Sequence, residues 1–296
     1  MRYSFIIPVY NRPEEVDELL NSLTRQTNKN FEVLIVEDGS SVPCKEVVDN
    51  YADRLDICYY FKSNSGPGQT RNYGAERGHG EYLIILDSDC ILPEGYLAAV
   101  ESELQRQKAD AFGGPDRAHD SFTNIQKAIN YAMTSFFTTG GIRGGKKKMD
   151  KFYPRSFNMG VRAEVYKALG GFSKMRFGED IDFSIRIFQG GYACRLFPEA
   201  WVWHKRRTDL KKFFKQVHNS GIARINLYKK YPESLKVVHL LPALFTIGIV
   251  FLLLCSLVCS WSLSLLLLFA LIICVDSTLR NKSFKIGLLS LSLIHI

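Results

Sequence analysis

The sequence lacks the cysteine patterns that would build a disulfide framework or a structural zinc site. Its 296 residues include seven cysteines, an odd number, and no Cys-x-x-Cys pair. Three of them, Cys255, Cys259 and Cys274, lie in an apolar stretch near the end of the chain. We therefore expect reduced cysteines that pack in the interior, because neither paired thiols nor metal-ligand spacing is present.

The sequence also shows no pattern typical of a signal peptide, of internal repeats or of a disordered linker. Met1 and Arg2 lead directly into residues 3–8, an apolar run that predicts a β-strand rather than a secretory leader. Apolar residues make up 46% and charged residues 23% of the chain, which is typical of a folded protein. The length allows one large domain and an appendage.

Charged residues are absent from one long stretch. Residues 237–275 contain no Asp, Glu, Lys or Arg. One membrane span needs roughly 20 apolar residues, so this run is too long for one span and fits two. We predict two transmembrane helices that form a hairpin, with Trp261 and Ser262 at the turn. The alternative is a buried hairpin of a soluble protein, although the run is far longer than an ordinary core helix.

Basic residues are concentrated beside this run. Between His204 and Lys236 there are ten Lys and Arg residues and two acids. The net charge of this segment is therefore 10 − 2 = +8, which equals the net charge of the whole chain. The rest is balanced, so an extended nucleic-acid surface is disfavoured and we expect no nucleic-acid partner. Arg280, Lys282 and Lys285 follow the run, which places both hairpin ends in the cytoplasm by the positive-inside tendency. We expect an integral protein of the cytoplasmic membrane.

Residues 208–236 have the pattern of a basic amphipathic helix. Apolar residues recur between Leu210 and Tyr231 with interleaved Lys and Arg, and Thr208 is the predicted N-cap. Such a helix could lie on the membrane with its charges near anionic head groups. It could equally pack on the preceding domain with its basic face in water, and the sequence leaves both interpretations open.

The first 207 residues alternate strand patterns with helix patterns. This alternation predicts an α/β fold with a doubly wound, mostly parallel sheet. The predicted strands span residues 3–8, 31–36, 55–61, 82–86, 109–113, 157–160 and 192–197. The predicted helices begin near Pro13, Arg71, Pro93, Arg162, Phe177 and Leu210.

The strand at residues 82–86 ends in two carboxylates, Asp87 and Asp89. In open α/β sheets, ligands bind beyond the carboxyl ends of the strands. Two neighbouring acids are unfavourable there unless a cation lies between them. Oxygen ligands suit Mg²⁺ or Mn²⁺, and these ions suit a diphosphate. The alternative is a solvated turn, because Asp and Ser are common turn residues.

Polar clusters follow two further strands at the same predicted edge. Residues 10–12 follow the first strand, and Glu37 with Asp38 ends the second. These acids could accept hydrogen bonds from a base or a ribose. Arg71 begins a helix after a glycine-containing loop and could bind phosphate together with the helix N-terminus; the alternative for Arg71 is a surface ion pair.

Four motifs in this half carry a resemblance to a known family. They are Pro8-Val-Tyr-Asn-Arg, Val36-Glu-Asp-Gly-Ser, Gly66-Pro-Gly-Gln-Thr-Arg-Asn and Leu86-Asp-Ser-Asp. In this order and spacing they resemble family 2 glycosyltransferases of the GT-A fold, over roughly residues 1–230. The resemblance implies a nucleoside-diphosphate-sugar donor, inversion at the anomeric carbon, and Mg²⁺ or Mn²⁺ on the Asp-x-Asp pair.

The resemblance also implies site residues. Asp89 would be the main metal ligand, with Asp87 nearer the ribose or bridging. The donor would be bound by Pro8, Tyr10, Asn11, Arg12, Glu37, Asp38, Gly68, Arg71 and Asp87. Glu37 replaces the usual first Asp of its motif, which leaves open which acid meets the base, and Cys90 stands where a third acid is common. A nucleotide-binding half would cover about residues 1–115 and an acceptor half about residues 116–207.

The second half supplies candidates for the acceptor side. Glu179 and Asp180 open a helix, where the dipole alone would favour acids as caps. The family places its general base at this point, so the resemblance implies Asp180 as the base, with Glu179 as the second candidate. His204 follows a strand and could be a further metal ligand or a structural histidine. The basic glycine-rich residues 140–148 could close over phosphates or form a solvated loop.

These patterns predict a membrane-anchored inverting glycosyltransferase, of hexosyltransferase type, with a cytoplasmic catalytic domain. The acceptor would be lipid-linked or a glycan, as in surface glycan or glycolipid synthesis. The alternatives are an inactive membrane-tethered protein that binds nucleotide sugars and, less favoured, a nucleotidyltransferase of the same fold. A phosphatase with Asp87 as nucleophile is disfavoured, because that pattern belongs on a first strand.

The last residues suggest an interrupted segment. Residues 286–296 begin a third apolar segment that is only 11 residues long, well short of the roughly 20 that a span needs. The final six residues also match the translation of a common transposon sequencing adapter. We therefore expect the native chain to continue from about Ser290 into a complete third span; a short interfacial tail is the alternative.

Overall fold

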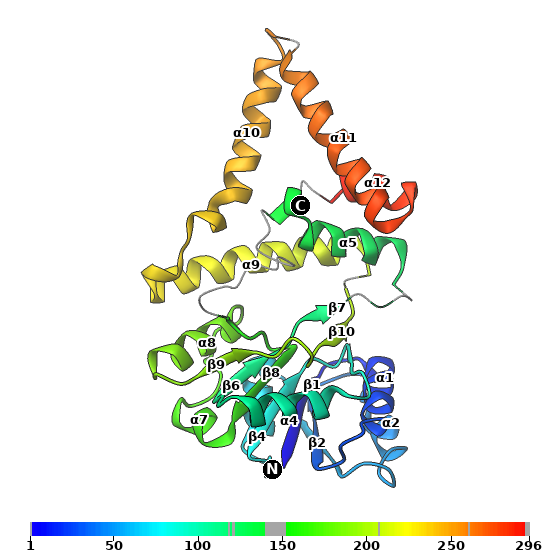
Figure 1. Ribbon diagram of the computed structural model, residues 1–296, viewed down its shortest axis with the longest axis vertical. Coiled ribbons are helices and arrows are strands. Elements are labelled where there is room, and N and C mark those ends of the chain that lie inside the picture. The colour runs from blue at the N-terminus through cyan, green and yellow to red at the C-terminus, as the bar shows by residue number, and fades with distance from the viewer. Residues whose placement is uncertain are drawn as a thin grey trace. The chain divides into compact units, whose positions relative to one another are not determined.

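The structure is a computed structural model that describes residues 2–117, 119, 122–139, 152–206, 208–259 and 261–293. It divides into two compact units. Unit 1 comprises Met1–His119 with Met149–His204, and unit 2 comprises Asp120–Lys148 with Lys205–Ile296. Figure 1 shows both units and labels their elements where there is room. The predicted basic loop at residues 140–148 lies outside the described residues.

Unit 1 is built on a seven-stranded sheet of order β3-β2-β1-β4-β8-β6-β9. The four strands β3, β2, β1 and β4 are parallel, and β8 is antiparallel to both of its neighbours, so the predicted mostly parallel sheet is confirmed. The strands are β1 (Tyr3–Val9), β2 (Phe31–Asp38), β3 (Ile57–Lys62), β4 (Tyr82–Leu86), β6 (Ala111–Gly113), β8 (Asn158–Arg162) and β9 (Cys194–Leu196).

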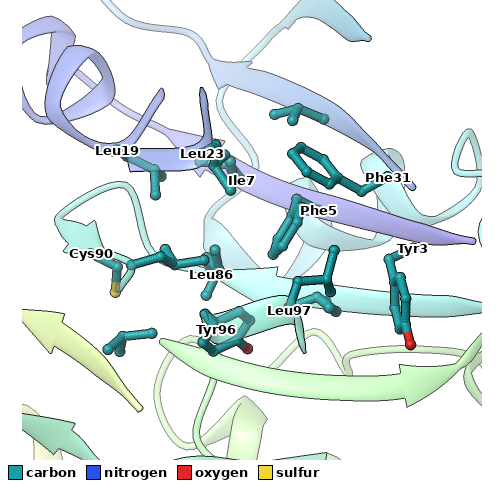
Figure 2. Packing of buried hydrophobic residues seen from close by; sticks show 14 of the residues in the cluster. Tyr3, Phe5, Ile7, Leu19, Leu23, Phe31, Leu86, Cys90, Tyr96 and Leu97 are labelled. Atoms are coloured by element: carbon teal, nitrogen blue, oxygen red, sulfur yellow. The ribbon is translucent and has the colours of Figure 1, made fainter. Parts of the chain in front are cut away.

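Helices cover both faces of this sheet, which confirms the doubly wound fold. Side chains of β1 alternate between the faces, as the period of a strand requires. Phe5 and Ile7 pack with α1 and α4, as Figure 2 shows, whereas Ile6 packs on the other face with residues of α7 and α8. The helices of unit 1 are α1 (Pro13–Thr24), α2 (Lys45–Asp49), α3 (Pro67–Ala75), α4 (Tyr96–Arg106), α7 (Ala163–Ala168) and α8 (Glu179–Gln189).

The strand order reverses at β1, between β2 and β4. Pairing of β1 with β4 ends at Ile6, whereas its pairing with β2 continues to Val9. Strands β1 and β4 therefore separate before Pro8, which has no backbone N–H to donate to a neighbouring strand. A ligand of an open α/β sheet binds at such a switch point, beyond the carboxyl ends of the strands. The loops after β1, β2 and β4 emerge at this edge.

A second sheet of three short strands was not predicted. It consists of β5 (Cys90–Ile91), β10 (Val202–His204) and β7 (Asp116–Arg117), in that order. Strands of two or three residues are too short to show a hydrophobic period. The antiparallel register places His204 opposite Cys90, directly after the Asp87 and Asp89 turn.

Unit 2 is helical, with a core formed by Ala128, Ile129, Phe213, Ile286 and Leu293. Its elements are α5 (Asn124–Thr134), α6 (Phe136–Thr139), α9 (Leu210–Lys230), two short 3₁₀ helices, η1 (Pro232–Ser234) and η2 (Val237–Leu240), α10 (Leu241–Cys255), α11 (Trp261–Asn281) and α12 (Phe284–Leu291). Within the described residues one helix, α11, is long and apolar enough to cross a membrane, and α10 is apolar but shorter.

Two local predictions in unit 2 are wrong. Trp261 and Ser262 are the first residues of α11, and the bend precedes them after Cys255. Ser256 is the C-cap of α10, and its Oγ donates to the carbonyl of Leu253 at 2.7 Å. The N-cap of α9 is Asp209, not Thr208, because the Asp209 carboxylate accepts the N–H of Lys212 at 2.7 Å.

Candidate active site

The loops after β1 and β2 are tied together by Asn11. Asn11 has a positive φ of 53°, a conformation that Asn tolerates better than most residues. Its N–H donates to Ser40 Oγ at 2.8 Å, and its side-chain oxygen accepts from Val42 N at 2.9 Å. Tyr10, beside it, is 53% exposed. The predicted donor-binding residues of the first motif therefore lie at the switch point on a fixed loop.

Glu37 is completely buried, and its carboxylate holds the loop after β2. One oxygen accepts from Ser40, and the other accepts from Cys44 N at 2.8 Å and Tyr59 Oη at 3.2 Å. All three donors belong to the protein, so the described contacts of Glu37 are structural. Its predicted contact with the nucleotide stays a prediction.

Asp38 organises the glycine-containing loop that leads into α3. Its carboxylate pairs with Lys62 and accepts from the N–H groups of Ser65 and Gly66, both at 2.9 Å. Burial acts to raise the pKa of this carboxyl, but the Lys62 side chain and the backbone donors outweigh it and hold the pKa below its ordinary value. Lys62 was missed in the sequence, because no local signal marks a lysine at the end of β3.

Arg71 is a buried cation between two acids, so the alternative of a surface ion pair is wrong. Its Nη2 donates to Asp87 Oδ1 at 2.8 Å and its Nη1 to Glu179 Oε1 at 3.0 Å. Its guanidinium also lies 5.3 Å from the ring centre of Phe172. Burial acts to lower the pKa of Arg71, but Asp87 and Glu179 outweigh it and raise the pKa, so the side chain stays charged.

Asp89 and His204 lie together at the small sheet. His204 Nε2 is 3.2 Å from Asp89 Oδ1, and Arg12 Nη1 is 3.5 Å from Asp89 Oδ2. Ligand atoms of Asp89, Cys90 and His204 lie within 4.8 Å of one another. The His204 ring stacks on Phe157 at 4.7 Å, which fixes its orientation. A carboxylate oxygen and an imidazole nitrogen this close form a donor set that fits a divalent metal ion.

Asp180 begins α8 beside Glu179 but has a different cation. Its Oδ2 accepts from Arg155 Nε at 2.8 Å, and its Oδ1 accepts from the N–H of Ile181 at 2.8 Å. The Arg155 side chain is 41% exposed. Burial raises the pKa of the neighbouring Glu179 carboxyl above its ordinary value, although Arg71 opposes this. Arg155 was also missed, because its partner lies on another element.

The structure therefore gathers most of the predicted residues at one edge of unit 1. Asp87 and Glu179 meet through Arg71, and Arg12 reaches Asp89 beside His204. Gly68 lies in the first turn of α3, where an added Cβ would be 3.3 Å from Glu179 Cγ. Asp180 and Arg155 form a separate pair at the start of α8.

Comparison with known proteins gives the same family that the motifs suggested. An uncharacterised glycosyltransferase of Rickettsia felis is 33% identical over 137 residues, which are 46% of this chain. The chain spans only 22% of the length of that relative.

Two solved structures have the same fold. The mannosyltransferase PcManGT from Pyrobaculum calidifontis, in complex with GDP-Man and Mn²⁺, superposes with a TM-score of 0.70 at 17% identity, covering 99% of this chain and 86% of that one. TarS residues 1–349 of S. aureus, in complex with UDP, superposes with a TM-score of 0.56 at 19% identity, covering 82% and 78%. Residues 4–170, more than half of the chain, match the family described as glycosyl transferase family 2, and the chain therefore belongs to that family.

Proposed function

We propose that the chain transfers a sugar from a nucleoside-diphosphate sugar to an acceptor hydroxyl, with inversion at the anomeric carbon. The observation that carries this proposal is the pairing of Asp89 with His204 at the switch point of the sheet, with Arg12 beside them. A metal–carboxylate centre at this edge suits the diphosphate of such a donor. Solved relatives of the same fold hold UDP or GDP-Man.

In this proposal Asp89 and His204 hold the divalent metal, and Asp87 lies nearer the ribose. The bound ion, Mn²⁺ or Mg²⁺, would offset the negative charge that develops on the leaving diphosphate. Tyr10, Asn11 and Arg12 would contact the nucleotide from the loop after β1. Mn²⁺ is present in the PcManGT complex, which supports a metal of this class.

Asp180 would act as the general base. Its carboxylate takes the proton of the acceptor hydroxyl while the hydroxyl oxygen attacks the anomeric carbon. The bond from that carbon to the diphosphate oxygen breaks on the opposite face, and the nucleoside diphosphate leaves with the bonding electrons. One displacement of this kind inverts the anomeric configuration. Arg155, which is partly exposed, must move or share the carboxylate during this step.

The membrane side of the proposal rests on unit 2. We propose that α10 and α11 form the predicted hairpin and that α9 lies in the membrane interface. Helix α9 buries Phe213 and Leu227, yet it exposes a second apolar stripe that includes Phe214, Ile225 and Tyr228. Lysines flank this stripe, as expected for a helix on anionic head groups. The acceptor would then be a lipid-linked or glycan substrate at the cytoplasmic face.

The test of the activity uses the full chain in detergent with Mn²⁺ and a panel of UDP- and GDP-sugars. We expect slow release of UDP or GDP from one donor in the absence of an acceptor. Asp89→Asn should abolish this release and weaken Mn²⁺-dependent nucleotide binding, while the circular dichroism spectrum stays unchanged.

The controls separate the alternatives. Asp53→Asn, at an 81% exposed side chain, should behave as the wild type. Nucleotide binding without release from any donor would favour the inactive binding protein. Full turnover of Asp89→Asn at saturating Mn²⁺ would refute the metal assignment.

A further inference from the structure

The adjacent acids Glu179 and Asp180 face two different cations. Glu179 forms an ion pair with Arg71, which is 4% exposed and also forms an ion pair with Asp87. Asp180 is bonded to Arg155, which is 41% exposed. Resting on the proposed function, we propose that the two acids have separate roles: Glu179 is a positioning residue that holds Asp87 through Arg71, and Asp180 alone is the base.

The geometry of Arg71 connects Glu179 to the donor side. Nη1 of Arg71 donates a hydrogen bond to Glu179 and Nη2 donates one to Asp87, so the two carboxylates fix the plane of the guanidinium. Nη2 binds Oδ1 of Asp87, and no side-chain hydrogen bond to Oδ2 of Asp87 occurs within the described ranges. Asp87 is 31% exposed. The arrangement therefore orients the Asp87 carboxylate and leaves its second oxygen for a ligand.

The cation that pairs with Glu179 is buried together with it. Glu179 and Asp180 are each 8% exposed, so their own burial does not distinguish them, but Arg71, the partner of Glu179, is only 4% exposed. The ring centre of Phe172 lies 5.3 Å from the guanidinium carbon of Arg71, which adds a cation–π contact to the two ion pairs. The raised pKa of Glu179 would suit a general base, but a base must also approach the hydroxyl. To approach a hydroxyl, Glu179 would have to give up its hydrogen bond to this buried arginine.

Asp180 differs from Glu179 in the exposure of its partner. Within the described part of the chain, the cation that forms an ion pair with its carboxylate is Arg155, whose side chain is 41% exposed and can turn toward solvent. Its Oδ1 is held by the N–H of Ile181, so the carboxylate keeps its orientation when Arg155 leaves. A fixed carboxylate with a displaceable partner suits proton abstraction, whereas a carboxylate locked on a buried arginine suits positioning.

The experiment measures two quantities on the full chain in detergent. One is the Kd of Mn²⁺–UDP and of Mn²⁺–GDP by calorimetry, and the other is kcat for donor turnover at saturating Mn²⁺ and donor. Asp87, which Glu179 would orient, lies nearer the ribose in the proposed function, and loss of an outer residue that orients a binding group next to a metal site typically weakens binding by about 10- to 100-fold. We therefore expect Glu179→Gln to raise the Kd about tenfold and to change kcat by less than about threefold. Asp180→Asn should leave the Kd unchanged and lower kcat by about 10²-fold.

A double-mutant cycle tests the route through Arg71. If Glu179 acts on Asp87, Glu179→Gln should add little to the Kd of Asp87→Asn, because the group that it positions is already altered. Its effect should add fully to that of Asp180→Asn. Glu179→Asp, which keeps the charge but is too short to reach Arg71, should reproduce the Kd defect. Glu164→Gln, at a 67% exposed acid, is the matched control and should change neither quantity.

The outcomes are distinct. A fall in kcat of about 10²-fold for Glu179→Gln at unchanged Kd would make Glu179 the base and overturn the proposal. Additive Kd effects of Glu179→Gln and Asp87→Asn would also overturn it. If the wild type binds nucleotide but turns over no donor, the proposed function fails, yet the Kd cycle still decides whether Glu179 positions Asp87.

Discussion

At the scale of single residues, the candidate site is a set of acids distinguished by what holds each of them. Glu37 is held by neutral donors, Asp38 by Lys62, Glu179 by Arg71 and Asp180 by Arg155. Their residue types alone do not separate these acids. A buried acid with several fixed donors supports the loop around it, whereas an acid with an exposed or displaceable partner can take part in chemistry.

Asp38 provides a test of this distinction through the pH dependence of stability. Its folded-state pKa is lower than the ordinary 3.8, so its contribution to the free energy of unfolding is complete above that pH and is lost as the pH falls through the lower value. Asp38→Asn should lower the free energy of unfolding by about 3 kcal/mol at pH 7, because it breaks a buried ion pair. The difference in free energy of unfolding between Asp38→Asn and the wild type should become smaller below about pH 4.

The measurement is chemical unfolding followed by tryptophan fluorescence in a Trp261→Phe background. Of the three tryptophans, the remaining two, Trp201 and Trp203, belong to unit 1. Asp53→Asn serves as the exposed control. If the free energy of unfolding differs between Asp38→Asn and the wild type by the same amount at every pH from 7 to 3, the ionised carboxylate does not stabilise the loop.

At the scale of elements, a close backbone approach positions His204. Gly114 lies between β6 and β7, and a Cβ added there would overlap the carbonyl oxygen of Ala200, just before β10. The same carbonyl accepts from Asn158 Nδ2 at 2.8 Å, and Asn158 Oδ1 accepts from Tyr96 Oη at 2.6 Å. This chain of contacts joins α4, β8 and the strand that carries the candidate metal ligand.

Gly114→Ala should therefore affect both stability and the metal site. The methyl group has to displace backbone atoms, so we expect a loss of about 3 kcal/mol, the upper end for overpacking. The shift of β10 should also weaken Mn²⁺-dependent nucleotide binding. Unfolding and calorimetry on the same preparation measure the two effects. Gly95→Ala is the control, since no atom lies within 4 Å of the added Cβ. Equal stability and equal nucleotide binding of the two variants would contradict the prediction.

At the scale of the whole molecule, the chain combines an α/β unit with a helical unit that exposes apolar surface. Exposed apolar side chains on α10 and α11 include Ile247, Phe251 and Leu271, at 65%, 63% and 59%. Soluble proteins rarely expose large apolar patches, and these two helices carry many exposed apolar side chains. The exposed stripe of α9 is amphipathic instead, which suits an interface rather than the interior of a bilayer.

Reconstituted vesicles test the proposed placement of α9. In vesicles that contain phosphatidylglycerol, trypsin should cleave slowly after Lys211, Lys215 and Lys229, and the double variant Phe214→Gln with Ile225→Gln should be cleaved faster. The hairpin should keep both proteins resistant to carbonate extraction. Phosphatidylcholine vesicles are the matched control, with faster cleavage expected. Cleavage at one rate with and without anionic lipid would place α9 outside the interface.

The sequence predicted those features that depend on local pattern. Residues 82–86 are apolar or aromatic without interruption, and residues 31–36 are apolar except for Glu32; a strand buried on both faces favours such runs, so β2 and β4 were found. The motifs after β1, β2 and β4 follow from the same alternation, since the carboxyl ends of parallel strands share one edge. The sequence could not show the small sheet that holds His204, because β5 and β7 have two residues each.

By itself, then, the sequence determined the doubly wound fold, the family and the acids at the switch point, because these depend on periodicity and on motifs of a few residues. Only the tertiary structure decided which acid meets which cation. Arg71 and Glu179 are 108 positions apart, and Arg12 and Asp89 are 77 apart. No local pattern encodes such pairs, since they arise only when packing of both sheet faces brings α3, α8 and the strand ends together. That packing pairs Glu179 with the buried Arg71 and Asp180 with the partly exposed Arg155.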